Sequence, residues 1–153
     1  MFSQQDHSFM QIAMEEAYEA EKRDEVPIGA VIVDPQTNEI IARNGNRTIE
    51  LSDPTAHAEI LVIREACKKI GKQRIPDFDL YVTLEPCTQC VGAIAFARIR
   101  KLVFAASDEK GGAVINGIKF FDQPTCHHKI GFEHGLMSDE SSALLKNYFK
   151  KKR

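Results

Sequence analysis

The segment Leu80–Ala106, which reads LYVTLEPCTQCVGAIAFARIRKLVFAA, indicates the fold class. Both of its ends are apolar and rich in β-branched or aromatic side chains, which predicts strands over Leu80–Leu84 and Lys101–Ala106. Pro86 and the small apolar residues after it predict a helix between these strands. A strand, a helix and a second strand at this spacing form a β-α-β unit, so we expect the two strands to run parallel in one sheet.

The segments on either side extend this unit. Ile28–Val33 and Glu39–Arg43 are apolar runs joined by turn residues, which predicts a β-hairpin. The remaining patterns predict a helix from about Ser3 to Arg23, a helix from Thr55 to about Ile70, a loop from Ser107 to Gly117, a short strand within Lys129–Leu136 and a helix from about Glu140 to Lys151. We therefore expect one domain over residues 1–153, an α/β fold in which a mixed five-stranded sheet lies between helices as a three-layer α/β/α sandwich.

Helical spacing also predicts which side chains face the core. Met10 and Met14 are expected to fill the core under the first helix. In the second helix, capped by Asp53 or Thr55, the buried face is expected to hold Ile60, Ile63, Ala66 or Cys67, and Ile70. In the last helix, the apolar side is expected to hold Ala143 or Leu144, Tyr148 and Phe149.

The composition narrows the class of protein. Hydrophobic residues make up 43% and charged residues 27%, which is typical of globular domains. No apolar run has the length of a membrane span and no signal peptide is evident, so we expect no membrane partner and a cytoplasmic location. Four cysteines without such a signal favour metal-binding or structural thiols over disulfides. The net charge of −2 does not favour a nucleic-acid partner, although binding depends on local charge.

His57-Ala58-Glu59 and Pro86-Cys87-Thr88-Gln89-Cys90 contain the residues with the clearest chemistry. Cys87 and Cys90 are spaced to share one face of a helix, and His57 near the start of another helix supplies a third ligand. Three protein ligands and an open fourth position are typical of catalytic zinc, which lowers the pKa of a bound water to about 7.

Glu59 lies two positions after His57. Inside a regular helix its side chain would point about 200° away from that of His57, but near a helix start it can border the open metal position. An isolated glutamate is usually a solvated carboxylate. Beside this cluster we interpret Glu59 as the proton shuttle.

Two other interpretations of the cluster compete with this one. A Cys-x-x-Cys pair also fits a redox dithiol, which would not require His57. A structural zinc site needs a fourth ligand. The remaining candidates for that ligand stand at no short spacing from the cluster: Cys67, Cys126, His7, His127, His128 and His134. We interpret Cys67 and Cys126 as structural and the pair His127-His128 as surface residues.

The chain resembles the cytidine-deaminase-like superfamily, in which His-x-Glu followed by Pro-Cys-x-x-Cys is the signature of zinc nucleobase deaminases. Within it, the chain looks most similar to the bacterial tRNA-specific adenosine deaminases. The resemblance covers most of the chain, including Val26–Val31, Gly45–Arg47, Asp53–Ile60, Leu80–Cys90 and Tyr148-Phe149. The metal motif indicates only the superfamily, whereas Leu84-Glu85-Pro86-Cys87 and the basic tail with its two aromatic residues point to the tRNA-acting family.

This resemblance implies hydrolytic deamination of adenosine to inosine at the wobble position of a tRNA anticodon loop. It implies one Zn²⁺ per subunit, held by His57, Cys87 and Cys90, with Glu59 moving protons. Further residues are implied to contact the substrate: Asn46 and the Ala58 backbone N–H at the base, and Asp108, Lys110, Tyr148 and Phe149 at the flanking nucleotides. The resemblance also implies a homodimer whose subunits both help to bind the RNA.

The C-terminal residues offer a physical reason for an RNA partner. Five positive side chains lie in the tail with no acid among them: Lys146, Lys150, Lys151, Lys152 and Arg153. Together with Tyr148 and Phe149 they would attract phosphates and stack on bases. The alternative is a solvated, frayed terminus.

One loop departs from the family pattern. Val114-Ile115-Asn116-Gly117 stands where the family usually has a small Gly-Ser pair, on a loop expected to border the nucleic-acid face. The RNA contacts of this loop are therefore left open. Two rival functions also stay open, a free-base or nucleoside deaminase acting on guanine or cytosine, and a zinc-stabilised RNA-binding module.

Overall fold

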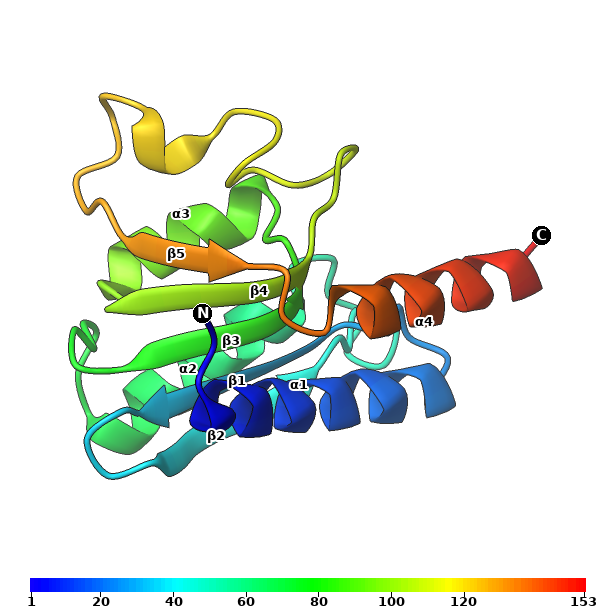
Figure 1. The fold of residues 1–153 in the computed structure, drawn as a ribbon, viewed down its shortest axis with the longest axis horizontal. Helices are drawn as coiled ribbons and strands as arrows, with labels where there is room; N and C mark the ends of the chain where they lie inside the picture. Colours follow the sequence, from blue (N-terminus) through cyan, green and yellow to red (C-terminus); the bar gives the residue numbers. More distant parts are fainter.

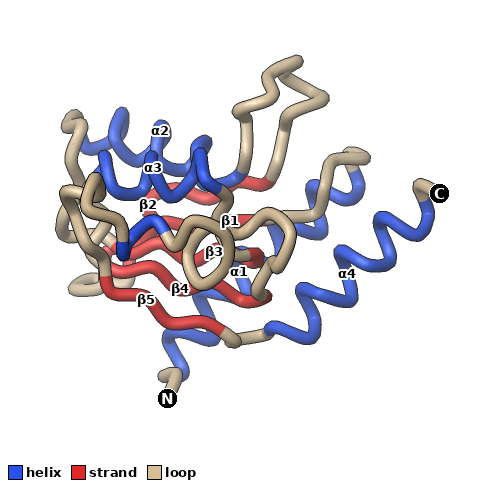
Figure 2. The backbone as a smooth tube through the Cα atoms, turned by 90° about the horizontal axis from the view of Figure 1, so that it is seen from above, coloured by secondary structure: helices blue, strands red, loops and turns tan.

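The computed structural model describes residues 1–153 and contains a five-stranded mixed sheet between two layers of helices (Figure 1, Figure 2). The strands, in the spatial order β2-β1-β3-β4-β5, are β1 (Gly29–Asp34), β2 (Glu39–Gly45), β3 (Asp79–Leu84), β4 (Lys101–Ala106) and β5 (Gly131–His134). The helices are α1 (Gln4–Lys22), α2 (Ala58–Ile70), α3 (Thr88–Ala97) and α4 (Ser138–Lys151), with a short 3₁₀ helix η1 (Phe120–Asp122). The predicted α/β/α sandwich is confirmed.

Strand direction brings the polar loops to one edge of the sheet. β1 pairs antiparallel with β2, as the predicted hairpin requires, and also with β3. β3 pairs parallel with β4, as predicted, and β4 pairs parallel with β5. All strands except β1 therefore end at the same edge. Asn46 and Glu85 follow directly after β2 and β3, and Asp108 is the second residue after β4. Ligands of α/β sheets bind at such carboxyl ends.

Alternation along the strands divides the core between the two faces. The face under α2 and α3 holds the larger cluster, which includes Ala30, Ile32, Leu80, Val82, Leu102 and Phe104. The opposite face under α1 holds a second cluster, which includes Val31, Val33, Tyr81, Val103 and Ala105. Figure 2 shows α2 and α3 on one side of the sheet and α1 with α4 on the other. None of the helices combines the length and the apolar composition that a membrane crossing requires.

Helix α1 lies unusually close to the sheet because glycines face it. A Cβ atom at Gly29 would collide with the carbonyl oxygen of Ala13, and one at Gly45 would crowd the carbonyl oxygen of Glu16. Met10 and Met14 are fully buried under this helix, as predicted. The close contact fixes the C-terminal end of α1, which lies beside the end of α4 (Figure 1).

Two helices begin later than predicted. Asp53 does not cap α2, because its carboxylate accepts the Thr55 N–H (2.9 Å) and hydroxyl (2.7 Å) within a turn. The N-cap of α2 is His57, and the N-cap of α3 is Cys87 rather than a residue inside the helix. Two of the three metal-ligand candidates, His57 and Cys87, therefore stand just before a helix, where helical phase does not dictate the direction of the side chain.

The predicted buried faces of α2 and α4 are partly wrong. Ile70 is exposed, because it lies in the last turn of α2, after Ala66, the last buried residue of this helix. Helix α4 begins at Ser138 and not at Glu140, and its buried face is Ser141, Leu144, Leu145 and Tyr148. That set has the spacing of one helical stripe, so Ala143 and Phe149 point to solvent.

Candidate active site

The three predicted ligands meet where α2 and α3 begin. His57 Nδ1 lies 3.6 Å from Cys87 Sγ and 3.5 Å from Cys90 Sγ, and the three ligand atoms all lie within 4.8 Å of one another. Neither N-cap side chain, His57 or Cys87, makes the capping hydrogen bond usual at this position. These side chains are therefore directed at each other instead of stabilising their own helices.

The distances fit a zinc ion. Bond lengths of about 2.3 Å to sulfur and 2.0–2.1 Å to nitrogen, at tetrahedral angles, place nitrogen and sulfur ligands about 3.6 Å apart. The two separations measured from His57 Nδ1 agree with this value. No fourth histidine, cysteine or acidic residue belongs to the group, and neither Cys67 nor Cys126 approaches it. The donor set is thus the three-ligand type, with room for a further ligand.

The pKa values of the ligand trio, His57, Cys87 and Cys90, favour cation binding. The Cys90 thiol, hydrogen-bonded to Cys87, lowers the pKa of Cys87 to about 4, and the His57 ring adds to this effect while burial opposes it. The same contact with Cys87, together with burial, raises the pKa of Cys90. The contact with Cys87 also raises the pKa of His57. A thiolate is therefore present near neutral pH, and a bound dication would displace the remaining protons.

Glu59, the predicted proton shuttle, is buried beside the trio. Only 4% of the residue is exposed, and it lines a cavity of about 220 Å³ together with His57 and Cys87. Because His57 precedes the helix, the 200° separation expected within a helix does not apply. Burial raises the pKa of Glu59 to about 7. A carboxyl group with a pKa near neutrality can both accept and donate a proton during one reaction.

The cavity collects several of the predicted residues. Its lining consists of Val26, Ile28, Asn46, His57, Glu59, Leu84, Glu85, Cys87, Asp108 and Gly111. Asn46 Oδ1 accepts the Ala58 N–H at 2.8 Å, which assigns the oxygen of this amide and leaves its NH₂ group as a donor. Ala58 is buried and its N–H is already engaged, so Asn46 is the member of this pair that faces the cavity.

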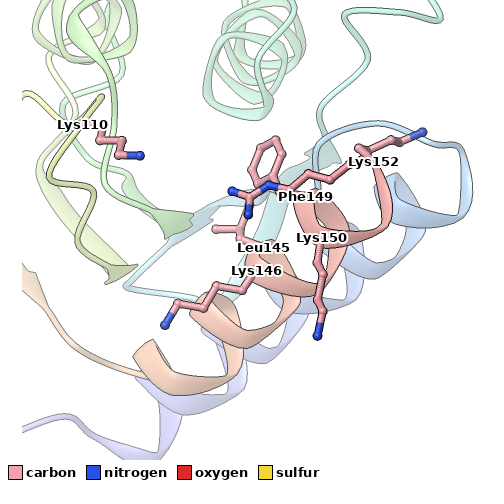
Figure 3. A pocket seen from close by; sticks show the side chains of 7 residues that line it. Lys110, Leu145, Lys146, Phe149, Lys150 and Lys152 are labelled. Carbon is pink, nitrogen blue, oxygen red and sulfur yellow. The ribbon is translucent and has the colours of Figure 1, made fainter.

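Two hollows continue from the cavity to α4. The first, the apolar groove, measures about 540 Å³ and shares Val26, Ile28, Leu84 and Asp108 with the cavity. The second, the basic groove, measures about 710 Å³ and is lined by Lys110, Leu145, Lys146, Phe149, Lys150, Lys152 and Arg153. Figure 3 shows Lys110 across the gap from Phe149 and Leu145, while Lys150 points away from it. Shared lining residues thus join the cavity to the positively charged tail.

Comparisons with known proteins assign this arrangement to a family. Residues 4–153 match the family of MafB19-like deaminases. The tRNA-specific adenosine deaminase of Agrobacterium fabrum is 57% identical over 145 residues, which is 95% of this chain and 94% of that protein. The chain belongs to the tRNA-specific adenosine deaminase family.

Solved structures also show greater similarity to a tRNA-acting deaminase than to a guanine deaminase. A structure from work on A-to-I editing by tRNA:A34 deaminases at the wobble position superposes with a TM-score of 0.87 at 58% identity, over 90% of this chain and 99% of that chain. Guanine deaminase from Bacillus subtilis superposes with a TM-score of 0.62 at 30% identity, over 94% of this chain and 92% of that chain. Both share the fold, and the tRNA-acting protein is the more similar of the two.

The two aromatic residues expected to contact RNA occupy different environments. Phe149 is 47% exposed and lines both grooves. Tyr148 is 7% exposed, lines neither groove, and donates its hydroxyl to the carbonyl of Asp24 at 3.2 Å. Lys152 pairs with Asp24 at 2.5 Å and lies over the Tyr148 ring. Phe149 is therefore an exposed ring at both grooves, whereas Tyr148 holds α4 against the end of α1.

Glu85 is a residue of the site for which the sequence suggested no role. Only 2% of this residue is exposed. Its carboxylate accepts five hydrogen bonds of 2.8–3.1 Å, from the side-chain amide of Asn116 and from the backbone N–H groups of Asp108, Val114, Ile115 and Asn116. Burial alone would raise the pKa of Glu85, but these donors hold the pKa below its usual value. The loop that departs from the family pattern is therefore the loop that Glu85 binds. The only sign of this role in the sequence was the position of Glu85, an acidic residue directly after a buried strand.

The remaining cysteines and histidines lie outside the site. Cys67 packs against the core beneath α2, and Cys126 is buried with its thiol donating to the His128 carbonyl. His127 is exposed, as predicted for a surface residue. His128 is half-buried and its Nε2 lies 3.0 Å from the Ile99 carbonyl oxygen, so it anchors a loop instead.

Proposed function

We propose that this chain hydrolyses adenosine to inosine and ammonia at the wobble position of a tRNA anticodon loop, with zinc as its metal. One observation carries the proposal: a three-ligand His/Cys/Cys group and a buried glutamate lie at a cavity that the apolar groove joins to the basic groove. Family membership supports the same reaction, since the relative from Agrobacterium fabrum, at 57% identity, is a tRNA-specific adenosine deaminase.

The residues of the cavity have separate roles in this reaction. His57, Cys87 and Cys90 would hold Zn²⁺, which would supply an activated water as the nucleophile for C6 of adenine. Glu59 accepts one proton from that water and delivers it to the ring nitrogen, and then moves the second proton of the same oxygen to the departing amino group. The NH₂ group of Asn46 donates to an acceptor on the base edge. The Ala58 N–H holds Asn46 in this orientation.

The grooves fit a single-stranded RNA. A cavity of about 220 Å³ accommodates one unstacked base, so the target nucleotide must leave its stack to reach Glu59. Lys110 and the basic side chains of α4 attract the phosphates of neighbouring nucleotides, and Phe149 stacks on one of their bases. Asp108 stands between the cavity and the apolar groove, where it meets the nucleotide next to the target.

The proposal extends to assembly and location. A homodimer is supported by the exposed apolar side chains of Phe96 on α3 and of Ile49 and Leu51 in the loop before α2, which a second copy would cover. Residues 1–153 act as a single catalytic domain in each subunit. Free thiols as metal ligands fit the reducing conditions of the cytoplasm.

Incubation of the purified protein with an anticodon stem-loop that carries adenosine at the wobble position tests the reaction. Nucleoside analysis should find inosine with the wild type, and Glu59→Ala should retain zinc and RNA binding but lose turnover by roughly 10²–10⁴-fold. Ammonia from guanine or cytosine without inosine would favour a free-base deaminase. RNA binding without any deamination would favour the zinc-stabilised binding module.

A further inference from the structure

We propose that two buried glutamates, Glu25 and Glu85, are positioning residues that each hold one loop of the active-site cavity in place. Glu25 holds the loop 46–57, which connects Asn46 to His57, and Glu85 holds the loop 107–116, which contains Asp108 and Lys110. The kinetic part of this proposal rests on the proposed function, whereas its structural part does not.

Glu85 binds its loop from within. Five hydrogen bonds converge on its carboxylate, three of them from the consecutive N–H groups of Val114, Ile115 and Asn116. Gly112 permits this close wrapping, because a Cβ atom there would collide with the Glu85 carboxylate and with the Asp108 carbonyl. The loop then presents Asp108 to the cavity and Lys110 to the basic groove.

Glu25 binds the opposite loop in the same manner. Only 1% of this residue is exposed, and its carboxylate accepts the N–H groups of Ile49 (3.1 Å) and Glu50 (2.8 Å) and contacts the Thr48 hydroxyl (3.4 Å). Arg23 adds a bond of 3.0 Å from its guanidinium to the Asn46 carbonyl. Both Arg23 and Glu25 follow α1, which the glycine contacts fix against the sheet. The end of α1 therefore sets the position of Asn46.

The chemistry of a carboxylate explains why a glutamate occupies both positions. Irregular loops have N–H groups with no strand or helix partner, and each such group needs an acceptor when it is buried. An ionised carboxylate accepts several hydrogen bonds and donates none. Glutamine has the same shape, but its NH₂ group would face N–H donors, so the exchange removes bonds without removing volume. Glu→Gln at either position is therefore a selective test.

The two loops carry different parts of the substrate site, so the two variants should differ. Glu25→Gln displaces Asn46, which binds the reacting base, and His57, which holds the metal, and should lower kcat about tenfold or more with little change in KM. Glu85→Gln displaces Lys110 and Asp108, which meet flanking nucleotides, and should raise KM for the stem-loop about tenfold with a smaller change in kcat. Each variant is the matched control for the other, with the same exchange at equal burial.

Limited trypsin digestion measures loop release without reference to activity. Glu85→Gln should speed cleavage after Lys110 at least about fivefold while cleavage after Arg47 stays at the wild-type rate, and Glu25→Gln should do the reverse. Zinc content and melting temperature are measured on the same samples. Equal acceleration at both sites in each variant, or no acceleration at either, would overturn the proposal even if the wild type deaminates RNA.

Milder variants decide the matter if a glutamine variant does not fold. Asn116→Ala removes one of the five bonds to Glu85, and Thr48→Val removes one contact with Glu25. Each should accelerate cleavage only in its own loop, and cleavage unchanged in both would overturn the proposal. If the wild type shows no deaminase activity while the digestion pattern holds, the proposed function fails and the positioning role stands.

Discussion

The side-chain oxygen of Asn46 accepts a hydrogen bond of 2.8 Å from the backbone N–H of Ala58. This bond ties the end of β2 to the first turn of α2, directly between His57 and Glu59. It satisfies one of the N–H groups left free at a helix start, and it directs the NH₂ group of Asn46 toward the cavity. One amide therefore supports the geometry of the metal site and offers a donor to the base.

Substitution of Asn46 separates these two roles. Asn46→Asp keeps an acceptor for the Ala58 N–H but loses the NH₂ donor, so zinc content should stay near one per chain while kcat/KM for the stem-loop falls about 10²-fold or more. Asn46→Ala loses both functions and should also lower the melting temperature. Asn147→Ala, on the exposed side of α4 and outside both grooves, is the control. Normal turnover by Asn46→Asp would contradict the base-binding role of Asn46.

The ligand trio was predictable because its signal is local. His57, Cys87 and Cys90 belong to two short motifs, and each motif lies at a helix start that the sequence pattern located to within a few residues. The β-α-β unit was predictable for the same reason, since one apolar strand and its neighbour are close along the chain. Local spacing thus indicates both the chemistry and the fold class.

The loop anchors were not predictable because their partners are backbone groups far along the chain. The N–H groups bound by Glu85 lie 23 to 31 positions away, and those bound by Glu25 lie 24 and 25 positions away. A backbone N–H is present at every residue except proline, so no side-chain pattern marks it. The different environments of Tyr148 and Phe149 depended likewise on how α4 rotates against α1, which adjacent aromatic residues do not reveal.

Metal removal should abolish activity while the fold persists. The sheet core consists of apolar contacts that do not involve the trio, so a chelator should leave far-UV circular dichroism nearly unchanged and lower the melting temperature by several degrees. Added zinc should restore activity. Cys90→Ser should show the same loss without recovery, whereas Cys67→Ser, outside the site, should behave as the wild type does. Unimpaired activity after complete removal of the metal would contradict a catalytic role for zinc.

Asp6 should make the stability of the protein sensitive to acid. Burial opposes ionisation of this group, but hydrogen bonds from Tyr81 and Ser3 hold its pKa below the ordinary value near 3.8. A carboxyl group with a lowered folded-state pKa contributes stability above its unfolded pKa and loses that contribution as pH falls through the folded-state pKa. Asp6→Asn should therefore melt below the wild type at pH 7, and the difference should shrink below about pH 4.

Melting curves across pH, with Asp139→Asn as the exposed control on α4, measure this effect. Asp139 lies in the first turn of its helix and makes no side-chain hydrogen bond to another element, so its variant should show only a small difference at every pH. A melting difference for Asp6→Asn that stays constant from pH 7 to pH 3 would contradict the role of the ionised carboxylate.

Phe149 and Tyr148 should respond differently to substitution. Phe149→Ala removes the exposed ring that lines both grooves, and the loss of one stacked base, about 1–3 kcal/mol, should raise KM for the stem-loop by roughly 5- to 150-fold at unchanged melting temperature. Tyr148→Phe removes only the hydroxyl that donates to Asp24 and should cost about 1 kcal/mol of stability with little change in KM. The KM of the wild type should rise steeply with salt, because phosphates release counterions when the lysines bind them. Equal KM increases in both variants would mean that Tyr148 leaves its buried position to contact RNA.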